Sequence, residues 1–197
     1  MESRAKFAGH PVHPMLIVFP LGLLSTAVVF DILFLVSNQV EWTRAAYYMI
    51  GAGVIGGLAA ALFGWIDWFA IPGRTRAKRV GLAHGVGNVV VLGLFTLSWV
   101  LRRPDPLTPP TGAIVAGLAG LVIALITAWL GGELVDRLGV GVDDGAHVDS
   151  PSSLSERPAG ANFTVHHTMA GGYAGTERRG FSQPAYAGVE RRSRGRG

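Results

Sequence analysis

Residues 112–132 read GAIVAGLAGLVIALITAWLGG, an apolar run of 21 positions without a charged side chain. A helix needs about 20 apolar residues to cross the hydrocarbon core of a bilayer, whereas the apolar stretch of a buried helix in a water-soluble domain covers only about 10–14. The run is therefore predicted to form a membrane-spanning helix, and the number of similar runs decides the fold.

Three further runs of this kind precede it. They are Pro14–Val36, Ala45–Phe69 and Val80–Leu101. Their only carboxylates are Asp31 and Asp67. Charged residues make up 15% of the chain, against about 25% in average soluble domains. Residues 1–142 are therefore predicted to form an all-α domain, a four-helix transmembrane bundle.

The composition changes after Val142. Residues 143–197 are rich in Gly, Ser, Pro and Arg and contain few large aliphatic side chains, so they cannot bury enough apolar surface to offset the cost of ordering the chain. We expect a disordered, basic, cytoplasmic tail. Its six Arg and two Glu from Glu177 onward favour attraction to anionic lipid over binding to nucleic acid.

The basic residues of the loops predict the orientation. The predicted second loop, Pro72–Arg79, contains four of them, whereas Ser37–Arg44 contains one. Because Lys and Arg are enriched in cytoplasmic loops, we expect a multi-pass protein of the inner membrane with both termini in the cytoplasm. Arg102 and Arg103, which fall in the predicted third loop, oppose this orientation weakly.

Two histidines stand at the entry of the first run, in the sequence GHPVHP of residues 9–14. A residue that precedes proline is biased away from the helical region, so His10 and His13 are predicted to lie on extended backbone. A purely structural role, shaping the start of a helix, is the alternative.

The third run contains His84 and, four positions later, Asn88. Residues with this spacing share one face of a helix, and an ionisable residue inside a span points to a functional site by default. A histidine that only forms a hydrogen bond between packed helices is the alternative. The glycines around it, Gly81 and Gly85, allow a neighbouring helix or a flat ligand to approach closely.

Ionisable residues gather at one end of all four spans. With both termini inside, Asp67 and Glu133 lie at the same membrane face as His10, His13 and His84, and we expect these five side chains to converge in one cluster. The two halves also hint at an internal repeat, in which His13 and Asp67 correspond to His84 and Glu133. Such repeats can be related by an axis along the membrane normal.

Several classes of site are excluded because the chain contains no cysteine. Disulfides, thiolate zinc sites, cysteine nucleophiles and iron–sulfur clusters all require it. No nucleophile motif such as GxSxG occurs either. The sequence therefore does not indicate an enzyme activity of its own.

Three segments together resemble the bacterial membrane family called domain of unknown function 2231. They are GHPVHP at the start, GLAHGVGN in residues 81–88 and WLGGELVDRLGVGV in residues 129–142, so the resemblance covers Gly9 to Val142. It implies four spans and no assigned biochemical activity. It also implies an association with redox proteins, because some members are joined to Rieske or cytochrome c domains.

Three functions remain open at this point, besides a transporter, for which four spans are few and no pair of broken helices is visible in the sequence. The first is a redox-associated module that binds b-type haem or quinone and works with electron-transfer proteins; its candidate ligand-binding residues are His10, His13, His84 and Asn88. The second is a site for a Zn or Fe ion; its candidate ligands are His10, His13, His84, Asp67 and Glu133. The third is a membrane scaffold or accessory subunit without chemistry, which could form a homo-oligomer in the lipid bilayer.

Overall fold

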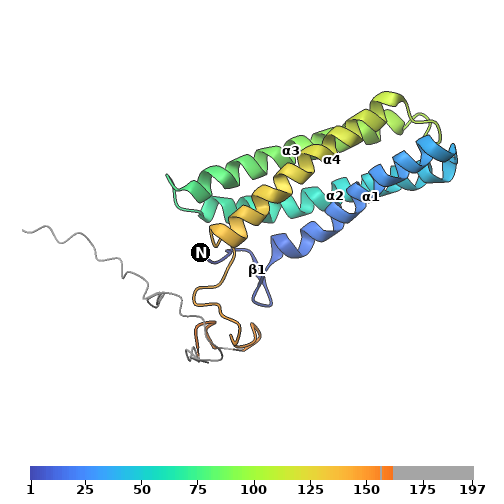
Figure 1. Ribbon diagram of the computed structural model, residues 1–197. Helices are drawn as coiled ribbons and strands as arrows, with labels where there is room; N and C mark the ends of the chain where they lie inside the picture. The colour runs from blue at the N-terminus through green and yellow to red at the C-terminus, as the bar shows by residue number, and fades with distance from the viewer. Residues whose placement is uncertain (156, 162–197) are drawn as a thin grey trace, which may run out of the picture. The chain divides into compact units, whose positions relative to one another are not determined.

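The computed structural model describes residues 1–155 and 157–161, and Figure 1 shows the arrangement of their helices. A small hairpin of two strands comes first, and two antiparallel pairs of long helices follow. The elements are β1 Lys6–Phe7, β2 His10–Pro11, α1 Val12–Ser37, α2 Val40–Ala70, α3 Arg76–Arg102, α4 Thr111–Gly132 and η1 Glu133–Arg137, which is a short π-helix. Most of the tail predicted to be disordered over residues 143–197 lies outside the described residues, which omit 156 and 162–197, and the domain boundary at residue 142 stays a prediction.

The four helices have the properties of membrane spans. Within the described residues, all four are long and apolar enough to cross a bilayer, with mean hydropathies of 1.8 to 2.4 over their most apolar windows. Their outward faces carry large apolar side chains such as Phe19, Ile55 and Leu125, which are 63–70% exposed. Such a surface suits lipid rather than water. The predicted four-helix membrane bundle is confirmed.

The helices run further than their apolar segments. α2 begins at Val40, so that the loop predicted over Ser37–Arg44 shrinks to two residues; Asn38 ends α1 in the left-handed conformation, with φ 56°. α3 begins at Arg76, where the Thr75 hydroxyl accepts a hydrogen bond from the backbone amide of Lys78 at 3.1 Å. Hydropathy marks the membrane-embedded part of a helix, whereas capping groups decide where the helix ends.

The bundle is built from two tight hairpins, α1 with α2 and α3 with α4. Between the hairpins, α2 and α3 pack more closely than α1 and α4 do, and α1 and α3 approach each other less than either of these pairs. α1 and α3 are therefore diagonal partners across the bundle. Each hairpin closes over a glycine: Leu24 packs where a side chain at Gly53 would stand, and Phe95 does the same at Gly120.

The two hairpins are structural repeats of each other. Leu24 and Phe95 are 71 positions apart, and Gly53 and Gly120 are 67 positions apart. The same shift of 71 positions relates the buried residues of α1 to those of α3. These pairs are Pro20 and Val91, Leu24 and Phe95, Ala27 and Ser98, and Asp31 and Arg102. The repeat suggested by the sequence is thus present, with different correspondences: Asp67 matches Leu134 rather than Glu133.

The last of these pairs forms an ion pair inside the bundle. Nη1 and Nη2 of Arg102 donate to Oδ1 and Oδ2 of Asp31 at 2.8 and 2.6 Å, and the two side chains are 0% and 1% exposed. Ser98 accepts from Arg102 Nε at 3.3 Å and donates to the carbonyl of Ala113 at 2.7 Å. The prediction that Arg102 lies in a loop is therefore wrong. The helix continues to Arg102 because its buried partner on α1 compensates its charge.

Breaking this pair should destabilise the bundle strongly. Arg102→Ala leaves the Asp31 carboxylate buried and unpaired, so we expect it to lower the free energy of unfolding by about 3–5 kcal/mol. Arg103→Ala is the matched control, because Arg103 is exposed and its guanidinium carbon lies 4.7 Å from the centre of the Trp99 ring. Unfolding in detergent, followed by circular dichroism, measures both. Replacing Asp31 and Arg102 together with Leu should recover most of the loss. Equal losses for Arg102→Ala and Arg103→Ala would contradict this account.

Candidate functional site

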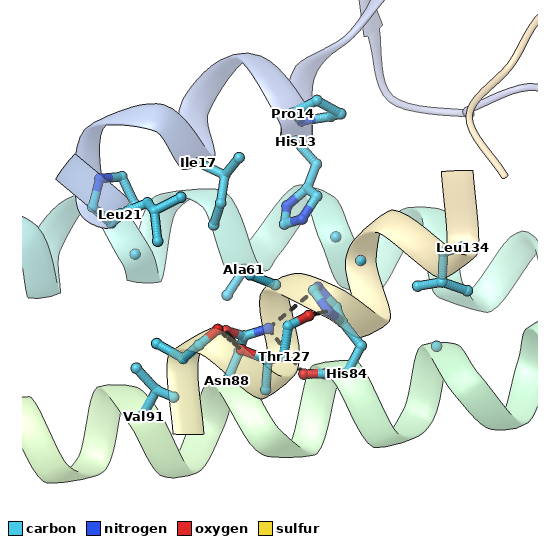
Figure 2. A pocket seen from close by; sticks show the side chains of 18 of the residues that line it. His13, Pro14, Ile17, Leu21, Ala61, His84, Asn88, Val91, Thr127 and Leu134 are labelled. Carbon is cyan, nitrogen blue, oxygen red and sulfur yellow. Dashed lines mark hydrogen bonds between the residues drawn. The ribbon is translucent and has the colours of Figure 1, made fainter. Parts of the chain in front are cut away.

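A cavity of about 390 Å³ lies between the two hairpins. It is at the end of the bundle where α1 and α3 begin and where α2 and α4 end. Its wall consists mainly of apolar side chains and glycines from all four helices, and its polar lining includes His13, His84, Asn88 and Thr127. Figure 2 shows these residues around the cavity. Its volume is within the range of about 300–1,000 Å³ that is typical of sites for small organic ligands.

His13 lies in the first turn of α1, so the prediction that it lies on extended backbone is wrong. Proline is tolerated in the first turn of a helix, since the amide that it lacks has no partner there, and Pro14 therefore does not break the helix. Nδ1 of His13 is 2.9 Å from the carbonyl oxygen of Ala60 on α2. Gly64 makes room for the ring, because a Cβ atom there would lie 3.0 Å from Cε1 and Nδ1 of His13.

His84 on α3 repeats this arrangement against α4. Its Nδ1 is 2.8 Å from the carbonyl oxygen of Thr127, and a Cβ atom at Gly131 would lie 3.2 Å from its Cε1. In both hairpins the carbonyl thus belongs to the residue four positions before the glycine. The two histidines are equivalent residues of the internal repeat, 71 positions apart.

The hydrogen bonds define the tautomer of both rings. A carbonyl oxygen can only accept, so Nδ1 of each histidine carries the hydrogen and Nε2 of the neutral ring is an acceptor. The amide of Asn88 donates to Nε2 of His84 at 3.2 Å and to the backbone carbonyl of His84 at 2.9 Å. Thr127 donates to Asn88 Oδ1 at 3.1 Å. Among the described residues, His13 Nε2 has no hydrogen-bond partner.

The two rings lie close together across the cavity. Their centres are 6.3 Å apart and their planes are inclined by 87°, and Figure 2 shows them on opposite sides of the space between α1 and α3. Two imidazoles that bind one metal from opposite sides, each with its nitrogen about 2 Å from the metal, have ring centres roughly 6 Å apart. The separation of His13 and His84 agrees with this value.

Asp67 holds the N-terminal segment of the chain. It accepts hydrogen bonds from the hydroxyl of Ser3 at 2.8 Å and from the backbone amides of Arg4 and Ala5 at 2.8 and 3.2 Å. The segment continues into the β1–β2 hairpin, where Ala8 and Gly9 both have positive φ, as in a tight two-residue turn. Asp67 therefore has a structural partner for both of its oxygens.

The other two predicted cluster members point elsewhere. Glu133 forms an ion pair with Arg76 at 2.6 Å, which ties the end of α4 to the start of α3. His10 lies on β2, and its Nε2 is 3.1 Å from the hydroxyl of Ser153. In the described part of the chain, no three His, Asp or Glu side chains are placed to hold one metal ion together. The structure thus brings together His13, His84 and Asn88. Asp67 also lines the cavity, but its oxygens are bonded to the N-terminal segment, and Glu133 and His10 have their partners outside the cavity.

The N-terminal segment closes the end of the cavity nearest the histidines. Met1 and the turn after η1 are joined by two backbone hydrogen bonds of 2.9 Å, from Met1 to Gly139 and from Gly141 to Met1. Pro11, Val140 and Gly141 line this end of the cavity. The opposite end leads to the buried side chain of Phe95 and, further along the bundle, to the Asp31–Arg102 pair.

Sequence reasoning missed the partners that orient the histidines. Thr127 and Ala60 accept through their backbone carbonyls, which every residue type has, so the sequence cannot identify them. Gly64 and Gly131 look like ordinary glycines at a helix-packing face. The repeat was the signal that could have found them: His13 and Gly64 match His84 and Gly131 once shifts of 71 and 67 positions are applied.

Comparison with known proteins agrees with this architecture. The family model described as "Predicted membrane protein (DUF2231)" matches residues 9–144. No curated protein and no solved structure matches the chain. The matched range includes all four spans, both cavity histidines and the turn after η1. The chain therefore belongs to the DUF2231 family of predicted membrane proteins.

Proposed function

We propose that this protein is a redox-associated membrane module that binds b-type haem in the cavity between its hairpins, with His13 and His84 as the two axial ligands. The observation that carries the proposal is the pair of imidazoles facing each other at 6.3 Å, each with Nδ1 bonded to a backbone carbonyl. Histidines that ligate a metal almost always donate their other ring hydrogen to a carbonyl or a carboxylate.

The number of ligands favours haem over a lone metal ion. A zinc site needs three or four protein ligands, whereas an iron held in a porphyrin ring needs only one or two, because the ring supplies the others. The cavity offers two histidines, and among the described residues no three His, Asp or Glu side chains are grouped to hold a metal ion. Asp67, which also lines the cavity, is bonded to the N-terminal segment. Haem would supply one-electron transfer.

The remaining side chains fit an apolar, flat ligand. Most of the residues that line the cavity are apolar, and ligand sites in helix bundles form between facing helices in this way. Gly64 and Gly131 make room for the two imidazole rings. On haem binding, Nε2 of His84 would bind the iron in place of the Asn88 amide, which lies 3.2 Å from it in this structure. Asn88 would keep the bond to the His84 carbonyl that holds its own amide in place.

The visible absorption spectrum tests the proposal. Protein purified from haem-supplied cells should show a strong Soret band and about one iron per chain. His13→Ala and His84→Ala should each abolish the band, because each removes one axial ligand. His10→Ala is the matched control and should retain it, since His10 contacts Ser153 outside the cavity. Added imidazole, which fits the space left by the ring, should restore the band of His13→Ala.

Other results would contradict haem binding and select an alternative. Bound zinc or iron without a Soret band would favour the metal site. A spectrum without a band and a sample without metal would favour the scaffold. Loss of the band in His10→Ala to the same extent as in His84→Ala would show that the paired rings are not the ligands.

We also propose that the cavity end of the bundle faces the cytoplasm, in the inner membrane. The loop between α2 and α3 and its flanks contain four basic residues, and cytoplasmic loops are enriched in them. The buried pairing of Arg102 with Asp31 supports the orientation further, because Arg102 no longer counts as a basic residue of the opposite loop. Arg44 and Arg103 remain on that side.

Labelling of single cysteines tests this orientation, since the chain contains no cysteine of its own. An impermeant thiol reagent applied to intact cells should label Gln39→Cys in the α1–α2 loop and leave Thr75→Cys unlabelled. Both should react after the cells are opened. Labelling of Thr75→Cys alone in intact cells would reverse the orientation.

A further inference from the structure

The internal repeat predicts that the two sides between the hairpins should be alike. A two-fold axis that exchanges α1 with α3 and α2 with α4 also exchanges the α2–α3 side with the α4–α1 side. The two sides nevertheless differ, because α2 and α3 pack more closely than α1 and α4 do. One side of the cavity wall is therefore more open than its counterpart.

Two tryptophans account for the closed side. Trp65 and Trp68 of α2 pack onto α3 at glycines: a Cβ atom at Gly85 would lie 3.3 Å from the ring of Trp65, and one at Gly81 would lie 2.8 Å from the ring of Trp68. Trp68 is fixed further by donating from Nε1 to the carbonyl of Lys78 at 3.1 Å. These rings fill the space between α2 and α3.

The equivalent positions in α4 and η1 hold smaller side chains. A shift of 67 positions relates Trp65 to Gly132 and Trp68 to Val135, so that no ring fills the α4–α1 side. Residues on both helices there line the cavity and are exposed at the same time. They are Pro14 and Leu21 on α1, Ala128 on α4, and Val135 on η1, which continues α4. These four residues are called the mouth below.

The mouth opens towards lipid rather than water. Phe19 and Leu125 on the same two helices are 64% and 63% exposed, as expected for spans whose outer faces contact acyl chains. Over the described residues, the N-terminal segment covers the cavity at one end and the Phe95 core fills the other. A molecule that reaches the mouth must therefore be dissolved in the membrane.

From this we infer that the mouth between α1 and α4 binds a lipid-soluble quinone or quinol, the class of electron carrier that is dissolved in the bilayer. The inference rests on the proposed function: a haem held by His13 and His84 lies beside the mouth, and the carrier that can touch it there comes from the lipid. The small residues Ala128 and Val135 leave space for a flat ring, and the apolar surface of α1 and α4 suits its long tail.

Photoaffinity labelling with an azido-quinone tests the inference in liposomes that contain the full-length protein. Mass spectrometry should map the label to peptides that contain Leu21 or Ala128, and excess unlabelled short-tailed quinone should compete for it. Ala128→Phe, which fills the mouth, should weaken competed labelling about tenfold, a loss that corresponds to about 1.4 kcal/mol. Leu125→Phe is the matched control, because Leu125 faces lipid without lining the cavity, and it should label like the unmodified protein.

The Soret band separates this inference from haem binding itself, and the thermal stability of each variant shows that it folds. A second filling variant, Val135→Phe, covers the case in which Ala128→Phe fails to insert, because Val135 is an exposed residue of the mouth. A haem-loaded protein whose labelling cannot be competed, as expected if acyl chains occupy the mouth, would overturn the quinone site and leave the haem site intact. Competed labelling that is equal in Ala128→Phe and Leu125→Phe would overturn the mouth as its location. Competed labelling at the mouth without a Soret band would support the quinone and contradict the haem.

Discussion

The buried contact between Asp31 and Arg102 connects the two halves of this protein. Lipid gives helices no hydrophobic reason to associate, so contacts between polar side chains and close packing at glycines have to hold the hairpins together. The helices α1 and α3 lie diagonally across the bundle, and their side chains meet at two places along it: at the Asp31–Arg102 ion pair and at the two histidines. The ion pair closes the diagonal at one end, and at the other end the two histidines face each other across the cavity. Both pairs consist of equivalent residues of the repeat, as expected where residues lie next to a two-fold axis.

The same symmetry explains why one site forms rather than two. A side chain near the axis meets its own counterpart, so His13 and His84 form a single pair with matching hydrogen bonds to Ala60 and Thr127. The departures from symmetry are equally informative. An acid opposite a base turns one pair into a salt bridge, and the replacement of two tryptophans by Gly132 and Val135 opens one side of the cavity to lipid.

The membrane fold could be predicted from the sequence, because span length and apolarity are properties of local segments. The partners of the ionisable residues could not. Depth in the membrane predicted that Asp67 and Glu133 lie near the histidines, but depth does not determine the direction in which a side chain points. Asp67 turns to the backbone of the N-terminal segment and Glu133 to Arg76. Arg102 was assigned to a loop because its partner on α1 is 71 positions away, and His13 was assigned to extended backbone because the rule for residues before proline is weak in the first turn of a helix.

The central claim is that His13 and His84 hold a ligand between them rather than contact each other directly. An experimental structure of the protein purified from its own membrane tests it most directly, at a resolution that shows the two rings. The account predicts a flat ligand between the two Nε2 atoms, with both Nδ1 atoms still bonded to the carbonyls of Ala60 and Thr127. Histidine rings in direct contact, with α1 packed against α4 and the cavity closed, would contradict it.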